Sequence, residues 1–323
     1  MSRVGVLMST YNGSEFIAEQ LNTILKQDYA DLTLSIVDDC SKDDTLKVVA
    51  AVVGDDSRVN FRRNSVNLGV NQSFGEVIAG AQRSDFYCLS DQDDLWPDGR
   101  LSQFIAIASE ADEKIPTLYV CQYQVFSGDV KAGVSPEASF ELLSLNSANI
   151  DWKRNLLSGN SLYGCCFFFN HALKELLGSI PKGRTTHDYW IALVAAYTGR
   201  IVLLPFVGTF YRQHTNNASY GAPSRNWRIK FSRLGRSLSE DIRARIDIST
   251  LFAALVAQHG NRLAAMDKVR LAQAAKAYEA GSVALIWFQI REKVWRPNLS
   301  ANILRVAACL LQIFRREPAS TKN

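Results

Sequence analysis

Residues 90–96 read Ser90-Asp91-Gln92-Asp93-Asp94-Leu95-Trp96 and directly follow the apolar run Phe86-Tyr87-Cys88-Leu89. A short apolar run that ends at polar residues is typical of a buried strand. Carboxylates at the exit of such a strand repel one another and lose hydration, so they need a cation or several hydrogen-bond donors. Two interpretations are open. The acids can cap a following helix, as Asp94 or Asp98 would, or Asp91 and Asp93 can share a hard cation.

The chain before this stretch alternates between expected strands and expected helices. Apolar runs predict strands at residues 4–8, 34–37, 59–61 and 86–89, and helical spacing predicts helices at 14–25, 43–52 and 71–83. Such alternation with short loops favours a mostly parallel sheet with helices on both faces, an α/β fold. Ligands of an open sheet of this kind bind beyond the carboxyl ends of its strands.

Four polar clusters are expected at that edge of the sheet, which four independent helix caps would not explain. Ser9, Thr10, Tyr11 and Asn12 can hydrogen-bond to a nucleobase or stack on it, and Asp39 can accept from a pyrimidine N–H. Asp91 or Asp93 with a divalent ion would neutralise a diphosphate. The remaining cluster is residues 67–69. The first loop has no glycine-rich phosphate fingerprint, which disfavours a dinucleotide oxidoreductase or a P-loop enzyme.

The middle of the chain supplies further candidates. Strands are expected at 117–121, 125–126 and 201–204, with a strand or hairpin within 155–170 whose Gly164 would let a ligand approach the backbone. Asp188 by itself fits an acid in the first turn of a helix. His187 by itself fits a surface or structural histidine. In the expected loop 211–217, Arg212 can pair with phosphate and His214 can bind metal, and a solvated loop is the alternative.

Composition narrows the class of protein. The 323 residues suit one large domain with an appendage, or two domains, and the net charge of +4 does not argue for nucleic acid. The cysteines form no CxxC pair and lie mostly in apolar runs, which predicts buried reduced thiols in a cytosolic protein. The amino terminus does not read as a signal peptide, and no apolar run is long enough to predict a spanning helix.

The character of the sequence changes near residue 222. We therefore expect a catalytic-type domain over residues 1–221 and a basic, amphipathic helical region over 222–323, with helices at 241–259, 262–281, 283–295 and 300–316. The dense apolar patch at 283–288 is flanked by Arg291, Lys293 and Arg296. Aromatic and basic residues together suit an anionic membrane surface. The alternative is a helical subdomain that packs on itself and on the sheet.

The ordered motifs resemble those of family 2 glycosyltransferases with the GT-A fold. They are residues 6–13, VLMSTYNG; 36–41, IVDDCS; 67–69, NLG; and 90–96, SDQDDLW. The later motifs, 187–190, HDYW, and 211–217, YRQHTNN, resemble the bacterial rhamnosyltransferase-type subgroup that builds surface polysaccharides. The resemblance covers roughly residues 3 to 218. Cys40 stands where the family commonly has glycine, and a small residue is retained.

The resemblance implies a role for each matching residue. The nucleotide would contact Asp91, on its ribose or through the water shell of the metal, and also Ser9, Thr10, Tyr11, Asn12, Asp39, Asn67 and Gly69. Asp93 would coordinate Mg²⁺ or Mn²⁺ on the diphosphate, with His214 as a further ligand. Asp188 would be the general base that takes the proton of the acceptor hydroxyl. The diphosphate and acceptor side would include Arg212, His187, Trp190 and Gly164.

The implied activity is inverting, metal-dependent transfer of a hexose from a dTDP- or UDP-sugar, with L-rhamnose from dTDP-rhamnose as the subgroup's donor. The implied acceptor is a polyprenyl-diphosphate-linked glycan of O-antigen or capsule synthesis, reached by a cytoplasmic enzyme peripheral on the inner face of the cell membrane. Alternatives are a UDP-hexose-dependent transferase of the same fold, a nucleotidyltransferase and a non-catalytic sugar-nucleotide-binding module. The first loop lacks the basic residue of a nucleotidyltransferase, and intact Asp91, Asp93 and Asp188 argue against a non-catalytic module.

Overall fold

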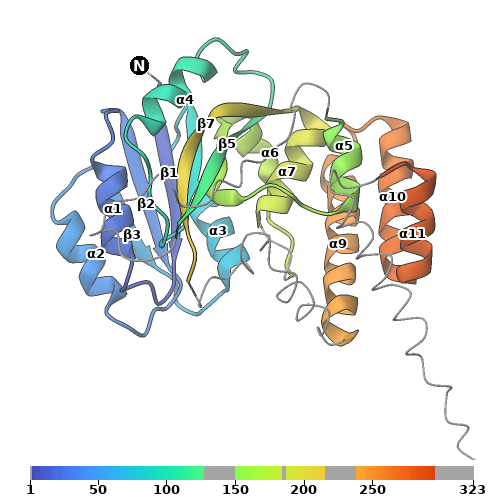
Figure 1. Cartoon of the computed structure of the whole chain (residues 1–323), viewed down its shortest axis with the longest axis horizontal. Helices are drawn as coiled ribbons and strands as arrows, with labels where there is room; N and C mark the ends of the chain where they lie inside the picture. The colour runs from blue at the N-terminus through green and yellow to red at the C-terminus, as the bar shows by residue number, and fades with distance from the viewer. Residues whose placement is uncertain (1, 127–149, 184–186, 215–237, 295–323) are drawn as a thin grey trace, which may run out of the picture. The chain divides into compact units, whose positions relative to one another are not determined.

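The computed structural model describes residues 2–126, 150–183, 187–214 and 238–294 (Figure 1). The chain divides into two compact units. The first unit comprises residues 1–149 and 161–222, and the second comprises residues 150–160 and 223–323. The domain boundary expected at residue 221 lies outside the described residues. The short segment 150–160, which precedes part of the first unit in the sequence, belongs to the second unit.

A seven-stranded sheet forms the centre of the first unit, in the order β3-β2-β1-β4-β6-β5-β7. Its strands are β1 (Val4–Thr10), β2 (Leu32–Asp38), β3 (Val59–Arg63), β4 (Phe86–Ser90), β5 (Thr117–Phe126), β6 (Phe167–Asn170) and β7 (Arg200–Arg212). Only β6 runs antiparallel to its neighbours β4 and β5 among these pairings. Every residue of β4 is buried, as expected for a central strand covered on both faces. The expected mostly parallel α/β sheet is confirmed.

Helices cover both faces of this sheet (Figure 1). They are α1 (Ile17–Leu25), α2 (Thr45–Val53), α3 (Val70–Ala79), α4 (Arg100–Ala108), α6 (His171–Leu177) and α7 (His187–Thr198). Helix α1 contacts α2, and Gln27, two residues after the end of α1, accepts the backbone N–H of Leu101 in α4 through its Oε1 at 3.2 Å. Helix α3 contacts α7, which also contacts α6. Right-handed crossovers between parallel strands produce two such layers.

Three expectations about local structure are corrected. The two strands expected at 117–121 and 125–126 are one strand, β5, which has irregular register near Gln122 where it pairs with β7. Tyr211 and Arg212, expected in a loop, are the last residues of β7, because their partners in β5 are apolar and extend the pairing. Helix α4 begins after Gly99, so Asp94 caps no helix. The helix-cap interpretation of the acidic stretch is therefore wrong for Asp94.

The second unit is helical where it is described. Its elements are α5 (Trp152–Asn155), η3 (Leu156–Ser158), α9 (Leu238–His259), α10 (Ala265–Ala280) and α11 (Ser282–Arg291). Helix α10 packs against both α9 and α11, and Tyr278 of α10 donates its hydroxyl hydrogen to the carbonyl of Leu157 at 3.1 Å. The helix expected at 300–316 lies outside the described residues. Among the described helices, none combines the length and apolarity that crossing a membrane requires.

Candidate functional site

The carboxyl ends of three neighbouring strands bring the polar loops together. Strand β1 pairs in parallel with β2 on one side and with β4 on the other. The register sets Thr10 opposite Asp38, and Met8 opposite Ser90. The loops that follow these strands therefore start at the same edge of the sheet. This is where the sequence predicted that nucleotide-binding and acidic residues would meet.

The loop after β1 is fastened by Gln92, which lies between the acids of the loop after β4. Its Oε1 accepts from the hydroxyl of Thr10 at 2.6 Å and from the backbone N–H of Tyr11 at 2.9 Å, and its Nε2 donates to the carbonyl of Tyr11. The amide lies so close to Gly13 that a Cβ there would be 2.2 Å from Oε1. The ring of Tyr11 stays 42% exposed and open to stacking.

Asn12 and Ser9 connect the same loop to its neighbours. Asn12 donates its N–H to the hydroxyl of Ser41 and accepts the N–H of Lys42 through Oδ1 at 2.8 Å, with φ of +47°. The hydroxyl of Ser9 donates to that of Ser73 in α3 at 2.8 Å. Both predicted nucleotide-site residues thus tie the loop after β1 to adjacent elements.

Asp39 organises the loop that precedes α3. Its carboxylate accepts from Nδ2 of Asn64 at 2.9 Å and from the backbone N–H groups of Leu68 and Gly69, each at 2.8 Å. Asn67 donates to the carbonyl of Asp39 at 2.9 Å. The carboxylate is buried, with 2% of the residue exposed. The structure therefore brings together three predicted nucleotide-site residues, Asp39, Asn67 and Gly69.

Cys40, next to Asp39, has φ of +64°. This is the left-handed region, which glycine enters without cost and which few other residues adopt. The glycine that is common at this position in family 2 glycosyltransferases is thus explained by the left-handed backbone conformation as well as by the need for a small residue. The Cys40 thiol lies 3.0 Å from the carbonyl of Asn64, and this contact accompanies the strained conformation.

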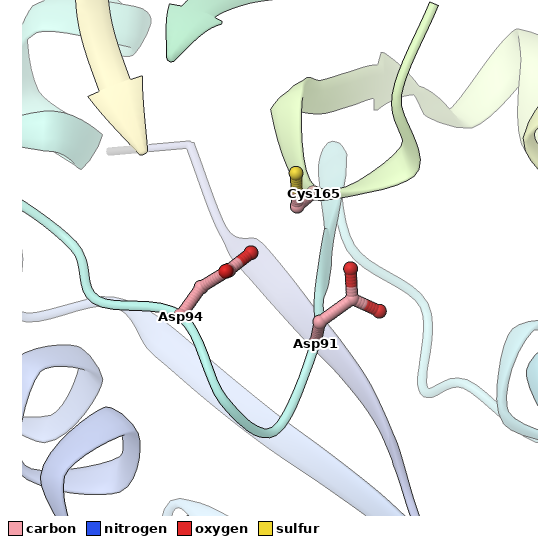
Figure 2. A group of neighbouring side chains, drawn as sticks. All are labelled: Asp91, Asp94 and Cys165. Carbon is pink, nitrogen blue, oxygen red and sulfur yellow. The ribbon is translucent and has the colours of Figure 1, made fainter. Parts of the chain in front are cut away.

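The acids after β4 occupy distinct environments. Burial, together with the charges of Asp93 and Asp188, raises the pKa of Asp91 to about 7. Asp94 is 1% exposed, and burial and its acidic neighbours raise its pKa well above the usual range. Its Oδ1 accepts the backbone N–H of Arg212 at 3.0 Å, and its Oδ2 has no hydrogen-bonding partner among the described residues. Figure 2 shows Asp91 and Asp94 on the two sides of one turn, below Cys165.

Within the part of the chain that the structure describes, two groups of residues could hold a divalent cation. In the first, Nε2 of His214 lies 2.8 Å from Oδ2 of Asp93, and both side chains are mostly buried. In the second, ligand atoms of Asp91, Asp94 and Cys165 lie within 4.8 Å of one another. Carboxylate and imidazole donors suit Mg²⁺ or Mn²⁺, and Oδ2 of Asp94 is a buried polar atom without a hydrogen-bonding partner among the described residues, which a cation would satisfy. The residues therefore fit the predicted metal.

Arg212 braces the acidic loop. Its Nε donates to the carbonyl of Asp93 at 2.8 Å, and its guanidinium forms an ion pair with Glu19 of α1 at 2.5 Å. The residue is 3% exposed, with its guanidinium carbon 4.8 Å from the ring centroids of Phe16 and Phe126. The predicted contact of Arg212 with a diphosphate remains a prediction, and bracing of the loop is what the described contacts show.

Asp188 lies in the first turn of α7 and contributes to the field at Asp91. Its Oδ1 accepts the N–H of Tyr189 at 2.6 Å. Gly164 packs against this turn: a Cβ there would lie 3.0 Å from Nε2 of His187 and 3.5 Å from Cβ of Asp188. The absence of a side chain at Gly164 therefore lets the start of α7 pack closely against it, and the predicted approach of a ligand to this backbone stays a prediction.

Two predicted acceptor-side residues close to Asp188 in the sequence are buried. Trp190 has no exposed surface, and its Nε1–H donates to the carbonyl of Leu177 at 2.8 Å. Its predicted acceptor-side role is corrected to core packing, because a fully buried ring cannot reach a substrate. His187 is 6% exposed and stacks on Phe74, and burial lowers its pKa to about 3, so its imidazole is neutral near pH 7. The structural interpretation of His187 therefore fits its surroundings.

Three site residues escaped the sequence-based prediction. Gln92 fastens the first loop, Glu19 pairs with Arg212, and Asn64 binds Asp39. Of the three, only Gln92 could have been found from the sequence. It lies inside the acidic motif, where an amide between carboxylates can form hydrogen bonds that hold the loop. The partners of Gln92 and Glu19 lie 81 to 193 positions away, so no local pattern indicates the pairing.

Comparison with known proteins identifies the class. The model of the family described as "Glycosyl transferase family 2" matches residues 5–177. The chain therefore belongs to glycosyl transferase family 2, and the expected enzyme class, a glycosyltransferase, is confirmed. The matched region contains the loops after β1, β2 and β4 but ends before Asp188 and His214.

Relatives with more specific names are similar over parts of their length. The putative colanic acid biosynthesis glycosyl transferase WcaA of Escherichia coli is 26% identical over 60% of this chain and 67% of its own. The dTDP-rhamnosyl transferase RfbG of Shigella flexneri is 37% identical, over 28% of this chain and only 32% of its own. The rhamnosyltransferase-type subgroup thus has support over a short stretch alone.

Solved structures share the fold. TarS of S. aureus, in complex with UDP-GlcNAc, superposes with a TM-score of 0.59 and 17% identity, covering 95% of this chain and 79% of that chain. The mannosyltransferase PcManGT of Pyrobaculum calidifontis, in complex with GDP-Man and Mn²⁺, gives a TM-score of 0.50 and 18% identity, covering 98% and 88%. The expected GT-A fold is confirmed.

Proposed function

We propose that this chain is an inverting, metal-dependent glycosyltransferase that transfers a hexose from a nucleoside-diphosphate sugar to a hydroxyl of a glycan. One observation carries the proposal. The acids of the loop after β4 and Asp188 of α7 lie close enough for the charge of Asp188 to raise the pKa of Asp91. The donor would bind at the acids of the loop after β4 and the acceptor at Asp188, so that the two substrates meet between these residues.

The nucleotide would occupy the edge formed by the loops after β1 and β2. Tyr11, with its exposed ring, would stack on the base, and Asp39 would order the loop and accept from the base. The nucleotide-side set is completed by Ser9, Thr10, Asn12, Asn67, Gly69 and Asp91. Their shared location at the edge, and the hydrogen bonds that Asn67 and Gly69 donate to Asp39, support this role.

The cation would be held by Asp93 and His214. When bound, it supplies positive charge against the negative charge that develops on the leaving diphosphate. Arg212 donates its Nε–H to the carbonyl of Asp93 and its backbone N–H to the carboxylate of Asp94. These two hydrogen bonds fix the loop that carries Asp93. Mg²⁺ and Mn²⁺ both accept such oxygen-rich donor sets.

Asp188 would accept the proton of the acceptor hydroxyl as that oxygen attacks the anomeric carbon. Attack from the face opposite the leaving nucleotide inverts the configuration at that carbon. Neutral His187, buried beside Asp188, adds no positive charge that would weaken the base. Gly164 keeps the approach to this turn free of a side chain.

The names of the relatives support the proposed donor and acceptor. RfbG is named a dTDP-rhamnosyl transferase, which supports dTDP-rhamnose as the donor. A Campylobacter jejuni relative, 29% identical over 34% of this chain, is named a glucosyltransferase acting on an undecaprenol-PP-linked glycan. It supports a polyprenyl-diphosphate-linked acceptor and keeps a UDP-hexose as the alternative donor. WcaA supports a role in bacterial surface polysaccharide synthesis.

A lipid-linked acceptor requires the enzyme to work at a membrane surface, and we infer that the second unit binds the inner face of the cytoplasmic membrane. Its described helices expose Met266 (66%), Trp287 (69%) and Ile290 (48%). Apolar and aromatic side chains on the surface of helices that also carry arginine and lysine suit an anionic interface.

A thermal-shift panel tests the proposal. The full chain is heated with UDP-GlcNAc, UDP-glucose, dTDP-rhamnose or GDP-mannose, with Mn²⁺ or with EDTA. A ligand at 100 times its Kd stabilises the fold by about 2.7 kcal/mol, so a true donor raises the Tm only when Mn²⁺ is present. Tm values that do not change with any nucleotide sugar at millimolar concentration would contradict it.

A further inference from the structure

The side chain of Asn71, in the first turn of α3, bonds to both sides of the segment that leads into α7. Its Oδ1 accepts the backbone N–H of His187 at 2.8 Å, and its Nδ2 donates to the carbonyl of Gly183 at 2.9 Å. Asn71 is 6% exposed. Gly183 and His187 flank residues 184–186, so a single amide fixes the residue that immediately precedes Asp188.

An amide suits this position because it supplies an acceptor and a donor at once. The first N–H groups of a helix have no partner within the helix. Asn71 satisfies one of them in α7 from a distance of 116 positions in the sequence, as a capping residue does locally. A carboxylate or hydroxyl at this position would not reproduce both bonds in the same way.

Packing restricts the same turn from two further sides. The ring of Phe74, one helical turn after Asn71, stacks on His187 with centroids 3.9 Å apart and planes at 20°. Gly164 also packs against His187, where a Cβ would be 3.0 Å from Nε2. The turn that carries Asp188 is therefore in contact with both α3 and Gly164, and the directional hydrogen bonds in this packing come from Asn71.

We propose that Asn71 is a positioning residue that places the carboxylate of Asp188 for proton abstraction. It acts through the backbone of His187 and not on the substrate. The inference rests on the proposed role of Asp188 as base. It also connects two parts of the site, because the N–H of Gly69, which precedes α3, is bound by Asp39 on the nucleotide side.

The expected signature is a loss of turnover without a loss of nucleotide binding. A misplacement of a catalytic group by about 1 Å costs on the order of 100-fold in rate, so Asn71→Ala should lower kcat by about that factor. The affinity for UDP with Mn²⁺ should stay within about twofold, since the groups proposed to bind UDP are left intact.

The experiment uses the full chain. UDP affinity is measured by calorimetry with Mn²⁺, and kcat by nucleotide release from whichever sugar nucleotide of the thermal-shift panel binds. Gln72→Ala is the matched control, because Gln72 lies on the same turn and donates to the carbonyl of Ile180 at 3.2 Å, on the same connection but farther from Asp188. It should keep kcat close to that of the unaltered chain.

The outcomes separate this inference from the proposed function. Asp188→Asn is measured in parallel. If Asp188→Asn keeps full kcat, the base assignment fails and the inference fails with it. If Asp188→Asn is inactive but Asn71→Ala keeps kcat, or loses UDP affinity as much as kcat, the inference alone is overturned. Should Asn71→Ala not fold, Asn71→Ser decides: its shorter side chain cannot keep both bonds of the amide, and an unaltered kcat in a folded variant would overturn the inference.

Discussion

Nε2 of His214 lies 2.8 Å from Oδ2 of Asp93, although the two residues are 121 positions apart. His214 follows the last strand of the sheet, and Asp93 lies in the loop after β4. Arg212 makes the meeting possible, because its backbone N–H and its guanidinium both bond to the acidic loop. The end of β7 and the acidic loop are therefore linked by hydrogen bonds. We propose that the cation binds where they meet.

Replacing His214 by alanine should weaken Mn²⁺-dependent UDP binding. The loss of an outer-shell partner of a metal ligand already costs about 10- to 100-fold in metal affinity, so the loss of a direct ligand should cost at least about tenfold. Calorimetric titration of UDP with and without Mn²⁺ measures this. His171→Ala is the control, since His171 is a partly buried histidine that contacts Tyr87 on another part of the sheet. Equal affinities for the two variants would contradict the assignment.

Replacing Arg212 by alanine should destabilise the first unit by about 3 kcal/mol, because it removes a buried guanidinium from its ion pair with Glu19 and leaves the carbonyl of Asp93 without its donor. Glu19→Ala should cost less, since the side chain of Glu19 is a third exposed. Urea unfolding measures both. Arg62→Ala, which removes an exposed ion pair with Glu76, is the control and should cost less than about 1 kcal/mol. A loss for Arg212→Ala as small as that of the control would refute the brace.

The buried imidazole of His187 predicts a pH-dependent stability difference. Its pKa is lowered by burial to about 3 in the fold, against about 6.5 in the unfolded chain. The unfolded state therefore binds the proton first, and the contribution of His187 to stability is present above pH 6.5 and is lost as the pH falls toward 3. One proton corresponds to a slope of about 1.4 kcal/mol per pH unit.

Asp91 contributes with the opposite sign in part of this window, because its pKa is raised to about 7 and the fold binds its proton first. Asp91 is present in both the unaltered chain and His187→Gln. Its contribution therefore cancels in the difference between their free energies of unfolding. Between pH 6.5 and 5, the unaltered chain should lose stability relative to His187→Gln in urea titrations. A constant difference across that range would show that His187 does not titrate as a buried group.

Two exposed apolar residues of α11 should contribute to membrane binding. Trp287 and Ile290 lie three positions apart and thus on neighbouring parts of the helix surface. Burial of one such side chain is worth about 1.5–3 kcal/mol, so Trp287→Glu with Ile290→Glu should lower the affinity for anionic vesicles at least about tenfold. Vesicle sedimentation measures this, with Ile246→Glu on α9 as the control. Unchanged sedimentation of the double variant would rule out this face.

The sheet and its ligand-binding edge could be predicted because their signals are local. Apolar runs such as residues 86–89 mark buried strands, and the acids follow at once. The length of β7 could not be predicted in this way. Its polar end at Arg212 is strand only because Phe126 of β5 pairs with it. Pairing between distant segments overrides the local preference for a loop.

The supporting residues of the site could not be predicted, and the reason is the same. Asn71 has no sequence signal for its bonds to Gly183 and His187, which lie 112 and 116 positions away. The buried position of Trp190 is equally hidden, because an aromatic residue beside Asp188 fits a substrate wall as well as a core. The motifs thus indicate the type of reaction, whereas tertiary packing determines which of their residues can contact the substrates.

The measurement that tests the central claim most directly compares Asp188→Asn with the unaltered chain. Asparagine keeps an Oδ1 acceptor for the N–H of Tyr189 but cannot take a proton, so the local structure is preserved while the base is removed. UDP affinity with Mn²⁺ is measured by calorimetry and kcat by nucleotide release. We predict unchanged affinity and a kcat lowered by about 10²- to 10⁴-fold. A variant that binds UDP normally and turns over at the original rate would contradict the account.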